Sequence, residues 1–232
     1  GRCPCGNDAD ACGPPPDGWD PETGKSAHIA YMLIARAGDG FGCNSVYRTG
    51  AGSWGVAQGD FDEDGRLDIV SAAELDTTFA FLSNTRYAPG FATFAPPVYS
   101  PAVSGPTDLV AADFDKDGHL DIFYTDKGAN LVAVLPGAGD GTLGTAQFDI
   151  VPSGPTWAAT ADFNNDTWPD AVVSSPDAGV LTVLLNDGAG DLRVHAQLPA
   201  GADPFTVIAA EIDGNPGIDI ACVERTDDQV YI

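Results

Sequence analysis

The chain has 232 residues and carries 34 acidic side chains against 10 basic ones, a formal net charge of −24. This charge argues against nucleic acid and anionic membrane surfaces as partners, because both are bound by clustered Lys and Arg. Hydrophobic residues make up 44%, enough for a sizeable core, while 28 Gly and 18 Pro favour turns over long helices. We therefore expect a folded chain that stays soluble by self-repulsion or collects cations.

Residues 1–27 differ in kind from the rest, being rich in Cys and Pro, and we expect them to form an irregular segment. Cys3, Cys5 and Cys12 lie close together, and Cys43 follows. Their spacing does not match a paired zinc motif, so disulfides among these four in an oxidising compartment are the leading interpretation, with metal binding or free thiols as alternatives. Cys222 lies in an apolar run and is predicted to be a buried free thiol.

Four segments that align without gaps recur along the rest of the chain. Their first acidic residues are separated by 53, 49 and 49 positions. The four segments are Gly59–Val70, Ala112–Phe123, Ala161–Val172 and Ala210–Ala221.

Each repeat contains four short strand-like runs separated by Gly and Asp, and no long stretch has a helical period. In the third repeat the runs are Trp157–Ala161, Ala171–Ser174, Val180–Leu185 and Leu192–Leu198. Four strands in about 50 residues are typical of one blade of a β-propeller. The sequence thus predicts an all-β propeller over residues 28–232, with a half-blade at 28–49 and repeats from about 50, 103, 152 and 201.

The two ends of the propeller region supply different strands. Ile29–Ala35 and Asn44–Thr49 resemble the third and fourth strands of a blade, whereas Phe205–Val223 supplies a first and second strand and Gln229–Ile232 begins a third. If the two ends formed one blade, Ile29–Ala35 and Gln229–Ile232 would compete for its third-strand position. We therefore expect no closed four-bladed ring, but a C-terminal truncation of a larger propeller or an open array whose edges a neighbouring chain covers.

Acidic or amide residues occupy positions 1, 3, 5 and 9 of the loop that begins at each repeat's first acidic residue, and position 7 would offer its backbone carbonyl. Alternate side chains of a tightly curled loop turn toward one centre, and hard oxygen ligands at this density suit Ca²⁺ better than Mg²⁺. The candidate ligands are Asp60, Asp62, Asp64, Arg66 and Asp68 in loop 1; Asp113, Asp115, Asp117, His119 and Asp121 in loop 2; Asp162, Asn164, Asp166, Trp168 and Asp170 in loop 3; and Glu211, Asp213, Asn215, Gly217 and Asp219 in loop 4.

Loops 1 and 2 should bind calcium most tightly, because each has four carboxylates and Gly at position 6, where a sharp turn is needed. Apolar residues at positions 2 and 8 are expected to point away from the ion into the sheet packing. An EF-hand would need a Glu at position 12, which holds Ser71, Tyr124, Val173 and Cys222 here, so EF-hands are excluded.

Because of these four acidic loops, the sequence resembles the FG-GAP (VCBS-type) repeat family over about residues 28–232. The resemblance implies a propeller, commonly seven-bladed, with up to four Ca²⁺ ions here between first and second strands, serving extracellular binding or adhesion. Loops 3 and 4 depart from the pattern with Thr167 and Pro216 at position 6, and loop 4 begins with Glu211.

No nucleophile elbow, zinc-protease motif or phosphate loop is present in the sequence, so we expect no enzyme. The leading hypothesis is a secreted or cell-surface propeller that binds a protein or builds a surface assembly, including self-assembly through open blade edges. A lectin is the alternative, since Trp54, Trp157 and Phe205 begin first strands and could stack on sugars, although packing between blades explains them equally well. An accessory propeller of a secreted polysaccharide hydrolase or lyase is the third hypothesis.

Overall fold

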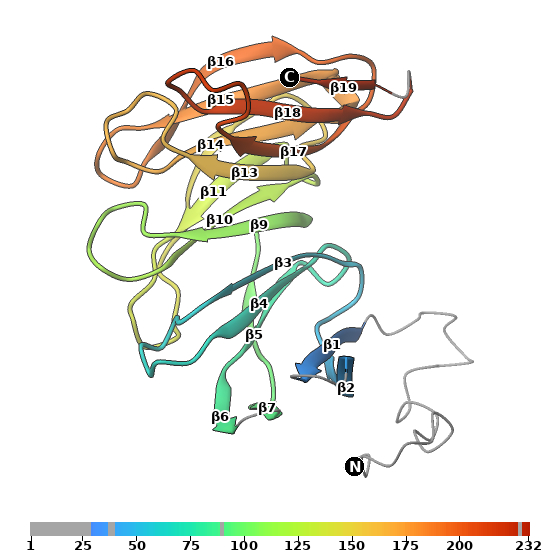
Figure 1. The fold of residues 1–232 in the computed structure, drawn as a ribbon, viewed down its shortest axis with the longest axis vertical. Helices are drawn as coiled ribbons and strands as arrows, with labels where there is room; N and C mark the ends of the chain where they lie inside the picture. The colour runs from blue at the N-terminus through green and yellow to red at the C-terminus, as the bar shows by residue number, and fades with distance from the viewer. Residues whose placement is uncertain (1–28, 37–39, 89–90, 227–228) are drawn as a thin grey trace.

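The computed structural model describes residues 29–36, 40–88, 91–226 and 229–232, and its regular secondary structure consists almost entirely of antiparallel strands (Figure 1). Within that part of the chain the only helical element is the 3-10 turn η1 (Pro176–Ala178), which confirms the expected all-β class. No helix in the described ranges is both long and apolar enough to span a bilayer.

Three complete blades follow one another, each a four-stranded sheet in which hairpin connections join neighbouring strands. Blade 1 has β3 (Ser53–Gly59), β4 (Asp68–Ala73), β5 (Thr78–Leu82) and β8 (Val98–Pro101). Blade 2 has β9 (Pro106–Ala112), β10 (Asp121–Asp126), β11 (Leu131–Leu135) and β12 (Gln147–Ile150). Blade 3 has β13 (Trp157–Ala161), β14 (Asp170–Ser175), β15 (Val180–Asn186) and β16 (Leu192–Pro199).

The end strands form smaller sheets of their own. The half-blade pairs β1 (Ile29–Arg36) with β2 (Gly40–Arg48), and blade 4 contains β17 (Pro204–Ala210), β18 (Asp219–Glu224) and β19 (Gln229–Tyr231). These two sheets lie at opposite ends of the described array in Figure 1. Strands from the two ends of the chain thus do not complete a common blade, in agreement with the expectation of no closed four-bladed ring.

The core lies between the blades, because every strand sends alternate side chains to its two faces. The first strands β3, β9, β13 and β17 lie against one another in sequence order. Between blades 1 and 2, for example, the buried rings of Phe79 and Tyr124 meet edge to face with their centroids 4.8 Å apart. Similar apolar clusters fill the next two inter-blade spaces, so neighbouring blades are joined by continuous apolar packing.

An additional hairpin interrupts blade 1 between its third and fourth strands. It consists of β6 (Asn84–Ala88) and β7 (Phe91–Phe94), which pair only with each other among the described strands. The connection between the third and fourth strands is four residues longer in blade 1 than in blade 2, which explains the longer first repeat spacing. This hairpin was not predicted from the sequence.

Candidate metal centre

All four acidic loops connect a first strand to a second strand and curl through left-handed backbone conformations. Position 4 has positive φ in every loop, at Glu63, Lys116, Asn165 and Gly214. The residue at position 6 is also left-handed in loops 1 to 3. Gly65 and Gly118 adopt this conformation without steric cost, whereas the side chain of Thr167 makes it unfavourable in loop 3. The predicted sharp turn at position 6 is therefore present in those three loops.

The carboxylate at position 9 closes each of the first three loops. Asp68, Asp121 and Asp170 are fully buried, and each accepts a hydrogen bond on Oδ2 from the backbone N–H of position 2, at 2.7–3.1 Å. On Oδ1 each accepts a second one, at 2.8 Å, from the N–H of a residue at or just after the end of the third strand. Those donors are Asn84, Gly137 and Asn186. The third strand thus completes the loop.

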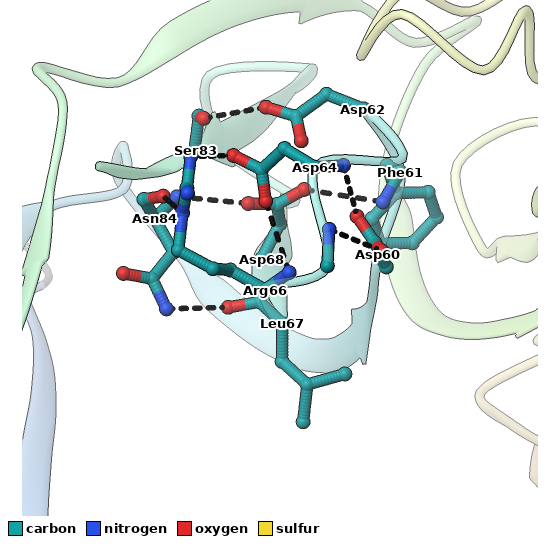
Figure 2. A network of polar contacts seen from close by, with 10 residues as sticks. Asp60, Phe61, Asp62, Asp64, Arg66, Leu67, Asp68, Ser83 and Asn84 are labelled. Carbon is teal, nitrogen blue, oxygen red and sulfur yellow. Dashed lines mark hydrogen bonds and ion pairs between the residues drawn. The ribbon is translucent and has the colours of Figure 1, made fainter. Parts of the chain in front are cut away.

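The carboxylates at positions 1, 3 and 9 converge in three of the loops. One carboxylate oxygen from each member lies within 4.8 Å of the others. The three groups are Asp60, Asp62 and Asp68; Asp113, Asp115 and Asp121; and Glu211, Asp213 and Asp219. Figure 2 shows the first group, with Asp60 accepting the N–H groups of Asp64 and Gly65 and Asp62 accepting the Ser83 hydroxyl at 2.8 Å. Three carboxylates so close repel one another unless a cation lies among them.

Two buried oxygens in these groups indicate that a cation fits. Asp62 Oδ1 in loop 1 and Asp113 Oδ1 in loop 2 are shielded from solvent and have no hydrogen-bond partner. An anionic oxygen left in this state is costly, whereas a hard divalent cation would satisfy it directly. The donor set of carboxylate oxygens is also the one that Ca²⁺ prefers. The residues of loops 1 and 2 therefore fit the predicted ion.

Position 5 lies outside the convergent groups. Asp64, Asp117 and Asp166 each accept the backbone N–H of position 7, at 2.8–2.9 Å, which closes a local turn. Asp64 also forms an ion pair with Arg66. The structure thus brings together three of the four predicted side-chain ligands in loops 1, 2 and 4, while position 5 stabilises the turn.

Side chains at position 7 connect neighbouring loops. His119 of loop 2 forms a hydrogen bond with Glu63 of loop 1, and this contact raises the pKa of the imidazole above its usual value. Lys116 of loop 2 lies 4.1 Å from the ring centroid of Trp168 in loop 3 and donates to Thr167 Oγ1 at 2.7 Å. Position 4 of one loop therefore contacts the following loop.

Burial is the main influence on the position-9 carboxyls. It raises the pKa of Asp68, Asp121 and Asp170, and the two backbone hydrogen bonds to each oppose this change. The nearby carboxylates of the same loop raise the pKa further. Burial and the neighbouring carboxylates thus both disfavour the ionised form of these side chains, and a cation at the centre of the loop would stabilise that form.

Loops 3 and 4 depart from this arrangement in different ways. Loop 3 has Asn164 at position 3, whose side-chain amide donates to Asp166 at 2.8 Å, so its carboxylates do not form a group of three. In loop 4, Pro216 cannot adopt a left-handed conformation, and Gly217 has φ of 143° instead. Asp219 is only half-buried and accepts the N–H groups of both Ile212 and Asp213 on one oxygen.

The following blade covers loops 1 and 2. The N–H of Gly141, in the connection between β11 and β12, donates to the carbonyl of Phe61 at 2.9 Å. The side-chain amide of Asn186 at the end of β15 donates to the carbonyl of Phe114 at 2.8 Å and to that of Pro169 at 3.1 Å. Asn186 was not among the predicted site residues, although an Asn also stands at the matching position 84.

The apolar positions follow the expected packing only in part. Phe61 and Phe114 at position 2 are buried, as predicted. The prediction was wrong for Ile212 and for Leu67 at position 8, which are 44% and 57% exposed. Each of the two residues lacks a neighbouring blade in the described structure. Leu120, which corresponds to Leu67, packs on the cluster between blades 1 and 2, whereas no described first strand precedes blade 1 and none follows blade 4, which holds Ile212.

The aromatic residues of the first strands separate into two groups. Trp157 packs in the cluster between blades 3 and 4 and meets Phe205 edge to face at 5.4 Å. Arg225 lies 3.8 Å from the centroid of the Phe205 ring. These contacts favour the packing interpretation for both residues, whereas Trp54 is 51% exposed.

The predicted cysteine chemistry is tested only at Cys222, which is a buried free thiol as expected. Burial raises its pKa above the usual value, so the thiol is not activated. The disulfides predicted among Cys3, Cys5, Cys12 and Cys43 involve side chains outside the described part of the structure.

Comparison with known proteins supports the fold. The chain resembles BBS1N in the crystal structure of its complex with ARL6DN soaked with lead (TM-score 0.53, 11% identity), covering 78% of this chain and 57% of that one. It also resembles an Agrocybe aegerita lectin that recognises non-reducing terminal N-acetylglucosamine (TM-score 0.50, 16% identity), covering 82% of this chain and 54% of that one. A Lactobacillus plantarum protein matches with a TM-score of 0.51 at 12% identity, covering 88% of this chain and 66% of that one.

At these identities the likeness concerns the fold alone, and this chain spans little more than half of the first two proteins. No curated protein matches the sequence. The profile of the FG-GAP-like repeat matches residues 113–173, from the start of loop 2 to the second strand of blade 3. The chain therefore contains an FG-GAP-like repeat within a propeller-like all-β fold.

Proposed function

We propose that this chain is a non-catalytic, calcium-stabilised propeller module that binds a protein partner outside the cell. The observation that carries the calcium assignment is the pair of buried, unpartnered oxygens, Asp62 Oδ1 and Asp113 Oδ1, each inside a group of three carboxylates. The extracellular location and the role in adhesion or surface assembly rest on the FG-GAP-like repeat and on the strongly acidic composition.

In this role, the bound ion would act on folding. Asp60, Asp62 and Asp68 would hold it in loop 1, and Asp113, Asp115 and Asp121 in loop 2. A cation bound only by the folded state stabilises that state by RT ln(1 + [L]/Kd), of the order of 2–4 kcal/mol for a well-saturated site. The ion would thus fix the loop between two strands and leave the blade surfaces for recognition.

Calorimetric titration of the chelator-stripped protein with Ca²⁺ tests this proposal. We expect saturable binding and a higher melting temperature with Ca²⁺, with weaker effects of Mg²⁺. Asp62→Asn and Asp113→Asn should each remove one tight site. Asp177→Asn removes the same charge at an exposed position in η1 and serves as the control. Absence of calcium binding by the wild-type chain would contradict the proposal.

Carbohydrate binding is the second candidate function. It is favoured by the half-exposed ring of Trp54 and by the lectin with a similar fold. A glycan array probed with the wild-type chain and with Trp54→Ala would distinguish it: a sugar ligand that the variant loses supports a lectin, and no glycan signal favours the protein-binding role. The third candidate, an accessory propeller of a secreted hydrolase or lyase, requires a catalytic segment in the same polypeptide, which the full-length gene sequence would reveal.

A further inference from the structure

A cavity of about 370 Å³ lies between the outer parts of blades 1 and 2. On the side of blade 1 it is lined by residues 100–103, which end β8 and lead into the next blade. On the side of blade 2 it is lined by Tyr124, Leu135, Leu143 and Ala146, among others. The cavity therefore lies within the array, between two complete blades, and its walls are largely apolar.

The apolar surface continues from the cavity along the outer strand β12. Phe148 and Ile150 pair with Ala133 and Leu131, which belong to the cluster between blades 1 and 2. Residues directly opposite each other in a sheet share a face, so Phe148 and Ile150 also face blade 1. They are 58% and 62% exposed, and Val103 in the cavity wall is 54% exposed. Three large apolar side chains thus surround the opening.

Hydrogen bonds bridge the outer parts of the other neighbouring sheets. Tyr99 occupies the position in β8 that Phe148 has in β12, and its hydroxyl donates to the carbonyl of Arg48 in the half-blade at 3.2 Å. Between blades 2 and 3, Asp149 Oδ2 accepts the backbone N–H of Val194 at 3.2 Å. The cavity thus lies at the one of these three junctions where Phe148 brings an exposed apolar ring in place of a polar bridge.

Backbone and charge around the cavity favour one kind of ligand. Among the described strands β12 is the last of its sheet, so an extended segment can pair with its free edge and place alternate side chains beside Phe148 and Ile150. Residues 96–103 and 143–150, which include both walls, contain one acidic residue, Asp149, and no basic residue. The whole chain carries a net charge of −24, which attracts a basic segment and repels an acidic one.

We propose that this cavity and the adjoining side of β12 bind an extended, basic segment of a partner protein. One apolar side chain of that segment fills the cavity, and others lie against Phe148 and Ile150. The cavity volume is at the lower end for small-molecule pockets and suits a side chain that anchors a longer ligand. The proposal rests on the protein-binding function proposed above and gives that function a site and a partner chemistry.

Fluorescence anisotropy with a short fluorescein-labelled peptide of alternating Lys and Val tests this site. The wild-type chain in Ca²⁺ buffer should bind the peptide saturably with one peptide per chain. A peptide in which Ser replaces every Val has the same charge but no apolar side chain. It should bind at least about tenfold more weakly, because the anchoring contact is lost.

Two substitutions and a matched control locate the bound peptide. Phe148→Ser removes the exposed ring, and Ala146→Trp fills the cavity. Each should weaken binding at least about tenfold. Leu198→Ser removes a side chain that is 44% exposed on the outer strand β16 of blade 3, so this control should bind like the wild-type chain. Unchanged unfolding midpoints of the three variants would show that they fold normally.

Four outcomes would overturn the proposal. The first is no peptide binding by a wild-type chain that still binds Ca²⁺, which leaves the calcium assignment intact. The second is binding that neither Phe148→Ser nor Ala146→Trp weakens, which would move the protein-binding function to another surface. The third is equal binding of the Ser peptide, which would show attraction by charge alone. The fourth is binding of the apolar dye anilinonaphthalene sulfonate without binding of the peptide, which would show that the cavity takes a small molecule instead.

Discussion

Loops 2 and 4 have acidic or amide residues at the same four positions and yet lie in different surroundings. In loop 2 the position-9 carboxylate of Asp121 is buried and accepts one N–H on each oxygen, and the loop's Phe114 carbonyl accepts a hydrogen bond from Asn186 of the following blade. In loop 4 the corresponding Asp219 is half-buried, and Ile212 beside it is exposed. The motif thus supplies the carboxylates, while the third strand and the next blade supply the buried surroundings that hold them in place.

The largest difference between the two loops is expected at position 9. Asp121→Asn leaves one of two buried N–H groups facing an amide NH₂ group, which should lower the free energy of unfolding by about 3 kcal/mol. Asp219→Asn should cost less than about 0.5 kcal/mol, because water can replace the lost contact. Urea unfolding in the presence of a chelator measures both values. Equal effects would mean that burial does not distinguish the loops.

Removal of the contact between blades should have the next largest effect. Asn186→Ala leaves the Phe114 and Pro169 carbonyls without their side-chain donor and should destabilise the protein by about 2 kcal/mol. Amide hydrogen exchange should rise in residues 113–121 of loop 2, although the substitution lies in blade 3. The peptide covering residues 60–68 of loop 1 is the internal control. Unchanged protection in loop 2 would show that the following blade does not support that loop.

The smallest expected effect concerns the left-handed position 6. Gly118→Ala should cost about 1 kcal/mol through backbone strain alone, because a Cβ at Gly118 would meet no atom within 4 Å. Thr167→Gly should instead stabilise loop 3 by about 0.5 kcal/mol, after the greater flexibility of Gly in the unfolded chain is subtracted. Thermal unfolding in chelator measures the two changes. A stabilised Gly118→Ala protein would contradict the assigned backbone conformation.

The repeat period of the sequence was sufficient to predict the blades. The aspartates at positions 1 and 9 end up at opposite ends of one loop, and this follows from local chain geometry. Strand alternation likewise placed Phe61 and Phe114 in the core, because position 2 has a fixed direction relative to the strands on both sides of the loop.

Other features depended on residues far away in the sequence. Leu67 and Ile212 have the same motif positions as buried residues and are exposed, because burial depends on whether a neighbouring blade is present. The turn role of Asp64 is local by contrast, because Asp64 pairs with Arg66 and accepts its backbone N–H only two residues away, but the spacing of the acidic residues did not reveal this role.

What the sequence alone determined is therefore everything that repeats: the strands of each blade, the position of each loop and the acidic or amide residues within it, since each depends on residues close to one another in the chain. Only the tertiary structure decided which carboxylates converge, which oxygens are buried without a partner and which blade faces remain open. Those properties arise from contacts such as Asn186 with Phe114, 72 residues apart, whose energy depends on packing that local sequence does not specify.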